Sequence, residues 1–411
     1  MEKGHLSQYF SGVAAKRLSQ VEVDKKTSNQ HEFNGSTALK NLLGTNDEGK
    51  TYNFPVKMMW MGDDRETVTA DGTLSWYDSR YNNKARAAEW RLYFPTTDVS
   101  EKAQVGDLLI LAQKPDGSIL CIITPQGSTT ENQLLWLFGV NVQDGKSFVA
   151  HVIEKADDKQ VDLVAGLIME ELGIAIEEPE DDQLDKLLEK FGGKFPKTII
   201  FSEFARKQLP VKVDPVNDPD GALIAWMEFE EKLFRRLERN IIKEKLEKGF
   251  MSVNGEMDVD DFIAFSLSVH NRRKSRAGFA LELHLEEIFK ANAIQYQRTA
   301  VTENKSKPDF LFPGVAAYRD KDFPAEKLTM AGAKTTCKDR WRQVLNEADR
   351  IPFKHLITLE PGISEDQTAE MQAHGLQLVV PEGIHGTYKG GQREWLMTVK
   401  EFMELVEERQ G

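Results

Sequence analysis

The segment Lys307-Pro308-Asp309-Phe310-Leu311-Phe312 places an aspartate directly before a short apolar run, and it decides how the C-terminal half is expected to fold. A second apolar run, Leu328-Thr329-Met330-Ala331, leads to Lys334. Short runs of apolar and aromatic residues are typical of buried strands. The interval between Asp309 and Lys334 is long enough for the chain to turn and return on one sheet. We therefore expect two adjacent strands that bring this carboxylate and this ammonium group together.

An aspartate and a lysine on neighbouring strands can act together on one phosphate group. Carboxylate oxygens are ligands that Mg²⁺ prefers. A bound Mg²⁺ stabilises the charge of a pentavalent phosphate and lowers the pKa of its water. The lysine adds positive charge beside the transition state and can orient the attacking water. The pair Asp309 and Lys334 therefore indicates Mg²⁺-assisted hydrolysis of a phosphodiester.

A second acid is needed, and its usual place two residues before the lysine is occupied by Gly332. Glu347 is the expected substitute, because it lies on a helix predicted from Asp339 to Arg350. At helical spacing, Arg340, Gln343 and Glu347 share one face of that helix, which can point the carboxylate back toward the metal ion.

A third acid is expected on a helix predicted from Gly278 to Lys290. Glu282 and Glu286 are one turn apart on one face of that helix. We favour Glu282 as the catalytic member, although either residue could equally be a solvated acid.

Two basic clusters accompany these acids. Arg272, Arg273 and Arg276 precede the helix of Glu282, and Lys338-Asp339-Arg340 opens the helix of Glu347. Arginine and lysine can bind guanine O6 and N7, and aspartate can accept from cytosine N4. The triplet therefore suits a reader of G·C pairs, although alone it would be an ordinary exposed helix start.

Length and composition indicate a globular protein with more than one domain. The chain of 411 residues is too long for one ordinary core. A hydrophobic content of 40% and a charged content of 29% are ordinary for a soluble protein. No apolar run approaches the ~18 residues of a membrane span. The N-terminus lacks a secretion signal, so we expect a cytoplasmic protein without a membrane partner.

Charge and cysteine content exclude few functions. The net charge of −13 argues only weakly against nucleic-acid binding, because binding depends on local basic surface. Much of the acid lies in one run, 177–182, which reads as a solvated connector. Cys121 and Cys337 are far apart in sequence and support neither a disulfide framework nor a zinc site.

The pattern divides the chain into a β-rich part at 1–155, a helical and acidic linker at 156–194 and an α/β part at 195–411. Many short strands with close turns predict a barrel or sandwich in the first part. In the last part, 212–221 reads as a loop and 226–247 as a long charged helix. The strands predicted in the first part are Val56–Met61, Gly72–Tyr77, Trp90–Phe94, Leu108–Leu111 and Ser118–Ile123.

The stretch from Val269 to Asp349 closely resembles the EcoRII-type restriction endonucleases of the PD-(D/E)xK superfamily, with weaker similarity from about Phe195 to Thr398. The blocks that carry the resemblance are Asn271–Gly278, Leu281–Glu286, Lys307–Pro313, Lys334–Gln343 and Asn346–Asp349.

The resemblance implies a catalytic set of Asp309, Lys334 and Glu347 in a restriction-endonuclease-like α/β core, with Mg²⁺ held by the two acids. It places Tyr318 near the site, although a packed tyrosine is the alternative. It also matches the arginine-rich block and the triplet 338–340 to base-reading segments. The family cuts double-stranded DNA at short sites such as CCNGG or CCWGG. A possible homodimer and a protective DNA methyltransferase in the host are further implications.

The N-terminal part more loosely resembles the plant-like DNA-binding pseudobarrel of the B-three type. Two polar loops on a barrel can enter a major groove and contact phosphates with lysine and arginine. Solvated barrel loops are the alternative. The first predicted DNA-binding arm contains Ser28, Asn29, Gln30, His31 and Asn34, and the second contains Arg80, Lys84, Arg86, Glu89 and Arg91.

Together these expectations describe a type II restriction endonuclease whose N-terminal domain binds DNA as a second recognition or regulatory module. Two alternatives remain open from sequence. One is a DNA-binding regulator with an inactive nuclease fold. The other is a repair or phage nuclease of the same fold without sequence specificity.

Overall fold

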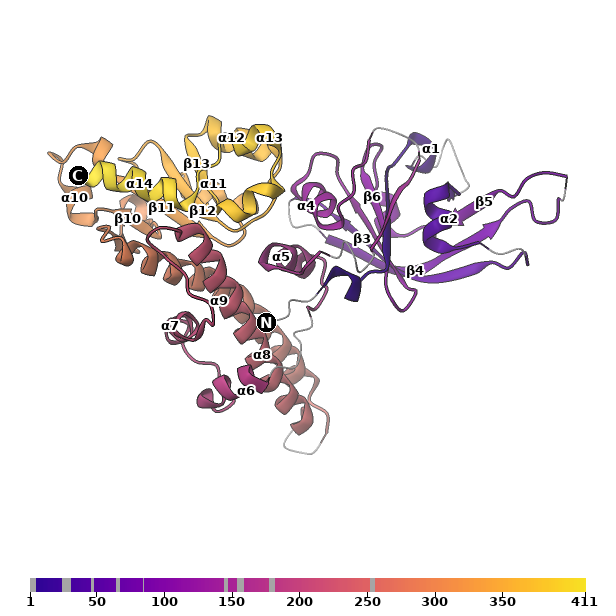
Figure 1. Cartoon of the computed structure of the whole chain (residues 1–411), viewed down its shortest axis with the longest axis horizontal. Coiled ribbons are helices and arrows are strands. Elements are labelled where there is room, and N and C mark those ends of the chain that lie inside the picture. Colours follow the sequence, from indigo (N-terminus) through magenta and orange to yellow (C-terminus); the bar gives the residue numbers. More distant parts are fainter. Residues whose placement is uncertain are drawn as a thin grey trace. The chain divides into compact units, whose positions relative to one another are not determined.

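The computed structural model describes residues 5–23, 31–45, 48–63, 67–83, 85–143, 147–153, 159–176, 182–251 and 256–411. The chain forms two compact units (Figure 1). The first comprises residues 1–172 together with the short segment 361–366, and the second comprises 173–360 and 367–411. The division at 172 falls within the predicted linker 156–194.

The first unit is built on one curled sheet of eight strands in the order β2-β5-β4-β3-β7-β6-β1-β8. Neighbouring strands are antiparallel except for β3 and β7, which are parallel. All five predicted strands are present, so the expectation of a β-rich, barrel-like N-terminal part is confirmed. The strands are β1 (Gly12–Arg17), β2 (Glu32–Asn34), β3 (Tyr52–Met61), β4 (Thr67–Asp78), β5 (Trp90–Tyr93), β6 (Leu108–Gln113), β7 (Ile119–Thr124) and β8 (Val149–Val152).

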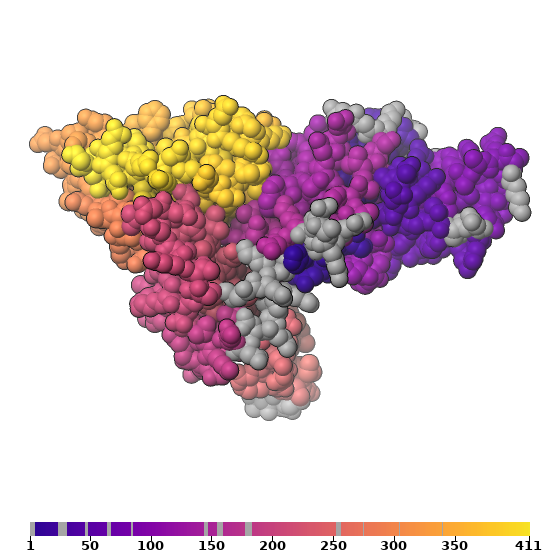
Figure 2. All heavy atoms as spheres, in the orientation of Figure 1, coloured from indigo at the N-terminus to yellow at the C-terminus, as the bar shows by residue number. Residues whose placement is uncertain are grey.

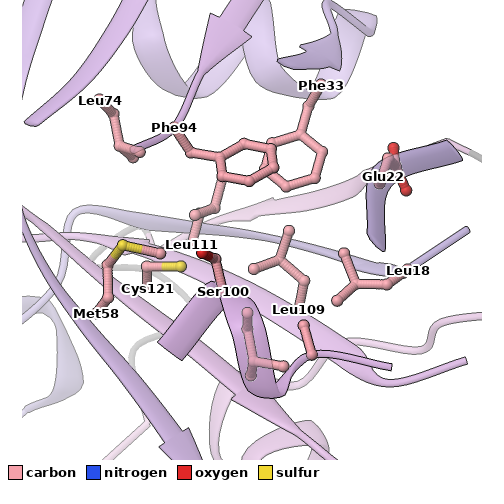
Figure 3. A pocket seen from close by; sticks show the side chains of 12 residues that line it. Leu18, Glu22, Phe33, Met58, Leu74, Phe94, Ser100, Leu109, Leu111 and Cys121 are labelled. Carbon is pink, nitrogen blue, oxygen red and sulfur yellow. The ribbon is translucent and has the colours of Figure 1, made fainter. Parts of the chain in front are cut away.

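The interior of this sheet is filled by apolar side chains, several of them aromatic. Trp76 stacks on Trp90 with ring centroids 5.1 Å apart, and Phe33 stacks on Phe94 at 4.6 Å. A cavity of about 20 Å³ remains beside these phenylalanines (Figure 3). Such a volume holds about one water molecule, so the sheet interior is a core and not a ligand pocket.

Short helices cover the sheet, and two of them begin at caps that the sequence provides. Ser128 caps α4, and Asp162 caps α5. The helix α5 lies within 156–194, the stretch that was predicted to be helical and acidic. The helices of this unit are η1 (Leu6–Gln8), α1 (Gln20–Val23), α2 (Thr37–Leu43), α3 (Asp98–Lys102), α4 (Thr129–Phe138) and α5 (Leu163–Glu171).

The second unit contains two long antiparallel helices, α8 (Pro219–Lys248) and α9 (Val259–Ala291). The C-terminal end of α8 and the N-terminal end of α9 extend away from the strands of this unit (Figure 1, Figure 2). The long helix predicted at 226–247 is confirmed, but it begins earlier, so the predicted loop at 212–221 is wrong at its end. Asp218 caps the helix and Pro219 occupies its first position, where proline is favourable. Shorter helices α6 (Asp182–Leu188), η2 (Glu189–Phe191) and α7 (Thr198–Gln208) precede them.

A mixed five-stranded sheet in the order β13-β12-β11-β10-β9 completes the second unit. β9, β10 and β11 are antiparallel neighbours, and β11, β12 and β13 are parallel. The predicted α/β part is thus confirmed. The strands are β9 (Gln297–Arg298), β10 (Phe310–Phe312), β11 (Thr329–Lys334), β12 (Lys354–Thr358) and β13 (Leu376–Val379). The short helices are η3 (Glu303–Lys305), α10 (Val315–Arg319), η4 (Ala325–Lys327), η5 (Lys338–Arg340), α11 (Trp341–Val344), α12 (Glu365–Ala373), η6 (Glu382–Thr387), α13 (Gly390–Arg393) and α14 (Val399–Gln410).

The helix predicted from Asp339 to Arg350 is wrong in its second half, because α11 ends at Val344. After it, Asn346 and Glu347 donate to carbonyls three residues back, a spacing tighter than that of an α-helix. Ala348 then has a φ of 52°, which an α-helix cannot accommodate. Glu347 therefore stands in a bend and not on a helix face.

No helix within the described ranges is long and apolar enough to cross a membrane.

Candidate active site

Asp309 and Lys334 are in contact at the end of two adjacent strands. Asp309 directly precedes β10, and Lys334 is the last residue of β11. Oδ2 of Asp309 accepts a hydrogen bond from the backbone N–H of Ala333 at 2.7 Å and from Nζ of Lys334 at 2.5 Å. The two groups thus form the expected pair, with the aspartate also fixed to the backbone of the strand that carries the lysine.

Glu347 is half-buried beside this pair. Its Oε2 is buried and has no hydrogen-bond partner among the described residues. Burial, with the nearby charge of Asp309, raises the pKa of Glu347 to about 7, while Lys334 and Lys354 oppose the shift. The bend at 345–348 therefore delivers the carboxylate to the place that the predicted helix was expected to reach.

Glu282 approaches the same site from α9. Burial and then the charge of Asp309 raise the pKa of Glu282, and Arg298 lowers it through an ion pair of 2.6 Å. Glu286, one turn later, has a different role. Although burial acts against ionisation, the hydrogen bond from Tyr296 Oη at 3.0 Å and the charge of Arg298 hold the pKa of Glu286 below its usual range. This difference agrees with the preference for Glu282.

The carboxylates suit a hard cation such as Mg²⁺. The described residues contain no cluster of three or more His, Cys, Asp or Glu that would form a closed metal site. Mg²⁺ is usually bound by one or two carboxylates together with water and substrate phosphate. Asp309 and the unpartnered Oε2 of Glu347 provide such a pair.

Tyr318 lies in a hydrogen-bond network that fixes the bend of Glu347. Its ring is buried, and its Oη donates to Glu303 Oε2 at 2.5 Å and accepts from the N–H of Arg350 at 3.2 Å. The same Glu303 oxygen accepts from the N–H of Asp349 at 3.3 Å. These contacts place Tyr318 behind the bend, and its catalytic role stays a prediction.

The arginines of the block 271–278 contact other side chains of the second unit. Arg272 lies 4.0 Å from the ring centroid of Phe195, and Arg273 pairs with Glu238 at 2.5 Å. Arg276 is buried and pairs with Glu231 and with Glu230, the latter at 3.1 Å. A base contact by Arg276 would require its guanidinium to leave both carboxylates.

The triplet 338–340 forms the one-turn helix η5 directly after β11. Arg340 folds back onto the carbonyl of Thr336. The backbone N–H of Lys338 donates to Glu360 Oε2 at 2.9 Å. The side chain of Asp339 lies outside the described atoms. The turn thus stands at the carboxyl end of β11, close in sequence to Lys334.

Sequence reasoning missed several residues that support the site, among them Glu303, Lys354 and Glu360. A signal for Glu360 was present, because it lies two residues beyond the apolar strand β12. Acids at the ends of buried strands were the criterion that selected Asp309. Glu303 and Lys354 carry no comparable signal.

The two predicted arms of the first unit meet on neighbouring strands, because β2 pairs with β5. His31 and Asn34 belong to this edge, whereas Ser28, Asn29, Gln30 and Lys84 lie outside the described residues. Glu89 pairs with Arg91 at 2.5 Å and with Arg80. Arg86 is exposed. The described ends of the two arms are therefore adjacent, and the contact of the arms with DNA stays a prediction.

Comparison with known proteins shows which protein family the second unit resembles. Residues 234–403 match the protein family described as EcoRII C terminal. This part of the chain therefore resembles the EcoRII C-terminal family. The predicted resemblance to the EcoRII-type enzymes is thereby confirmed for these residues.

The chain is also similar to individual proteins. The chain is 48% identical over 187 residues to the type II restriction enzyme EcoRII of Escherichia coli, a region that covers 45% of each protein. The chain therefore spans less than half of this relative in the alignment. Two solved structures are also similar. One is metal-depleted Ecl18kI in complex with uncleaved, modified DNA, with a TM-score of 0.45, 20% identity and coverage of 55% of this chain and 83% of that one. The other is a PspGI–substrate DNA complex, with a TM-score of 0.39, 12% identity and coverage of 57% and 98%.

The raised pKa of Glu347 predicts how Glu347→Gln changes stability with pH in the presence of a metal chelator. The folded-state pKa of about 7 exceeds the usual 4.5, so the stability associated with protonated Glu347 is present below pH 4.5 and lost as pH rises through 7. The glutamine side chain imitates the protonated form. At pH 8 the variant should be more stable by about 2 kcal/mol, after a discount for residual exposure, and near pH 4.5 the two proteins should be equal.

Denaturant unfolding of the second unit at pH 4.5, 6, 7 and 8 measures this difference. Glu404→Gln on the exposed face of α14 is the control, because it changes charge without burial. A stability difference that does not vary with pH would refute the assignment of Glu347 to a half-buried position that disfavours the ionised carboxylate.

Proposed function

We propose that the protein is a type II restriction endonuclease that hydrolyses double-stranded DNA at a short CCNGG- or CCWGG-like site with Mg²⁺. The observation that carries the proposal is the contact of Asp309 with Lys334, with the unpartnered Oε2 of Glu347 beside it, in a region that matches the EcoRII C-terminal family. The relative that is 48% identical over 187 residues is named as a type II restriction enzyme, which supports the same activity here.

In this mechanism each side chain has a separate task. Lys334 presents its ammonium group to the scissile phosphate, where it adds positive charge and orients a water for attack. Asp309 holds Lys334 at 2.5 Å and, with Glu347, provides the oxygens that would hold Mg²⁺. When bound, the metal ion neutralises phosphate charge and acidifies water. Glu282 adds a further carboxylate near Asp309, and Arg298 keeps it in place.

Plasmid cleavage tests the activity. With Mg²⁺ the wild-type protein should produce discrete bands, and Asp309→Ala and Lys334→Ala should each reduce the single-turnover rate by at least about 100-fold, because each removes charge stabilisation at the phosphate. Glu370→Ala is the control, since this acid is solvent-exposed and its side chain pairs only with Arg342 among its described contacts. Smeared products would indicate a non-specific nuclease, and no cleavage over many sequences would indicate a DNA-binding regulator.

We propose further that the first unit binds DNA as a second recognition or regulatory module. Its two arms end at the neighbouring strands β2 and β5, and arginines 80, 86 and 91 belong to the second arm. Glutamates 32 and 89 neutralise part of that charge. On DNA binding, the paired arginines would exchange these carboxylate partners for DNA phosphates.

A second copy of the site, added as a short duplex, should change the rate of cleavage. The double variant Arg80→Ala, Arg86→Ala should need about ten times more of this duplex for the same change. The reason is the loss of two phosphate contacts. Lys114→Ala, in the turn between β6 and β7, is the control. The proposal fails if the double variant and the wild type respond equally.

A homodimer is a further part of the proposal, supported by an exposed apolar face on the first half of α9. Val259, Phe262, Ile263 and Leu267 recur at helical spacing and are 48–64% exposed. An apolar stripe of this kind usually marks an interface. A cytoplasmic location and a host methyltransferase that protects the same site complete the proposal.

Phe262→Asp should shift the protein from dimer to monomer in sedimentation experiments by raising the dissociation constant at least about tenfold, because a charge would be buried in the interface. The control is Asp260→Asn, which lies on the same helix and is exposed. If both variants sediment as the wild type does, this face is not the dimer interface.

A further inference from the structure

Glu360 is a buried carboxylate at the carboxyl end of β12. The strand runs parallel to β11, with Thr358 opposite Lys334. Glu360 therefore stands next to the chain that leaves β11 and forms the turn 337–340. It is 1% exposed, although its position after a strand would ordinarily bring an acid to the surface.

One oxygen of Glu360 binds the start of the turn directly. Oε2 accepts from the backbone N–H of Cys337 at 2.5 Å and of Lys338 at 2.9 Å, and from Cys337 Sγ at 3.0 Å. Hydrogen bonds of backbone N–H groups to a charged carboxylate are stronger than those to a neutral oxygen. The carboxylate thus fixes two consecutive peptide groups.

The other oxygen has no such partner. Oε1 is buried and without a hydrogen bond among the described residues. A buried carboxylate with an unsatisfied oxygen lowers the stability of the folded state. An apolar residue at this position would avoid that cost but would leave the N–H groups of Cys337 and Lys338 without this acceptor. The acid is therefore explained by the turn that it binds and not by the packing of the core.

The backbone of Glu360 is itself fixed. Its carbonyl accepts from Tyr388 Oη at 2.6 Å, and its N–H donates to Thr358 Oγ1 at 3.1 Å. Both partners are buried. Glu360 is therefore a rigid support, and the turn is the part that it holds.

The turn needs such a support because Lys338 has a φ of 36°, a conformation that is unfavourable for residues with a side chain. Strained backbone of this kind persists only where surrounding contacts enforce it. The two N–H groups that Glu360 binds belong to this strained residue and to the residue before it.

We infer that Glu360 is a positioning residue for base recognition, which holds the backbone of the turn 337–340 in the conformation from which the triplet 338–340 is predicted to reach base edges. This inference rests on the proposed function of the domain. Glu360 touches neither Asp309 nor Lys334 in any described contact, so its role lies in discrimination between sequences. Loss of the charge loosens the turn while hydrolysis of correctly placed DNA continues.

The variant Glu360→Gln tests the inference, because it keeps the shape of the side chain and removes the charge. The quantity to measure is the ratio of kcat/KM for the cognate site to that for a site with one substituted base pair. This ratio should fall about tenfold, within the discrimination that one base contact provides. Tyr388→Phe, which frees the backbone of Glu360 and leaves its carboxylate in place, should lower the ratio by a smaller factor. Glu370→Gln, which affects only the exposed pair with Arg342 on α11, should leave it unchanged.

A second readout separates positioning from general support of the fold. Hydrogen exchange of the amides of Cys337 and Lys338 should accelerate in Glu360→Gln, while amides of β11 and β12 retain their protection. An unchanged ratio overturns the inference, and so does an equal loss of cleavage at both sites together with faster exchange throughout the sheet. Absence of any site-specific cleavage by the wild-type protein would instead refute the proposed function.

Discussion

The contact between Asp309 and Lys334 is the constraint on which the catalytic unit depends. An aspartate and a lysine in contact satisfy each other's charge, and the antiparallel pairing of β10 with β11 sets their distance. The pKa values of Glu282 and Glu347 are raised first by burial and then by the charge of Asp309, and the charge of Lys334 opposes both shifts.

Around this pair the structure supplies supports from different elements. Arg298 holds Glu282, and the network of Glu303, Tyr318 and Arg350 holds the bend that carries Glu347. Each support fixes a group in place without contact with the Asp309–Lys334 pair in the described interactions. Preorganisation of this kind lowers the reorganisation that a reaction requires.

The sequence predicted the strands and the acid–lysine pair well, because buried strands leave a strong local pattern and Asp309 and Lys334 lie at the ends of two of them. It predicted the wrong support for Glu347. The residues from 339 to 350 do follow helical spacing. The backbone nevertheless leaves the helix through a tight turn and the positive φ of Ala348. The residue types at these positions do not signal either feature. The occupied state of Arg276 depends on Glu230 and Glu231, which lie on another helix, so no local pattern could reveal it.

The acids, the lysine and their supports lie between Glu282 and Glu360, on one continuous stretch of chain. The sheet of the first unit is formed by residues before 173. The segment 361–366 is the part of the first unit that comes from later in the chain. Exchange of the gene region that encodes the N-terminal sheet would therefore leave every member of this constellation encoded on the same fragment. Because of this order of residues along the chain, recombination could join the whole candidate site, as one fragment, to different N-terminal domains.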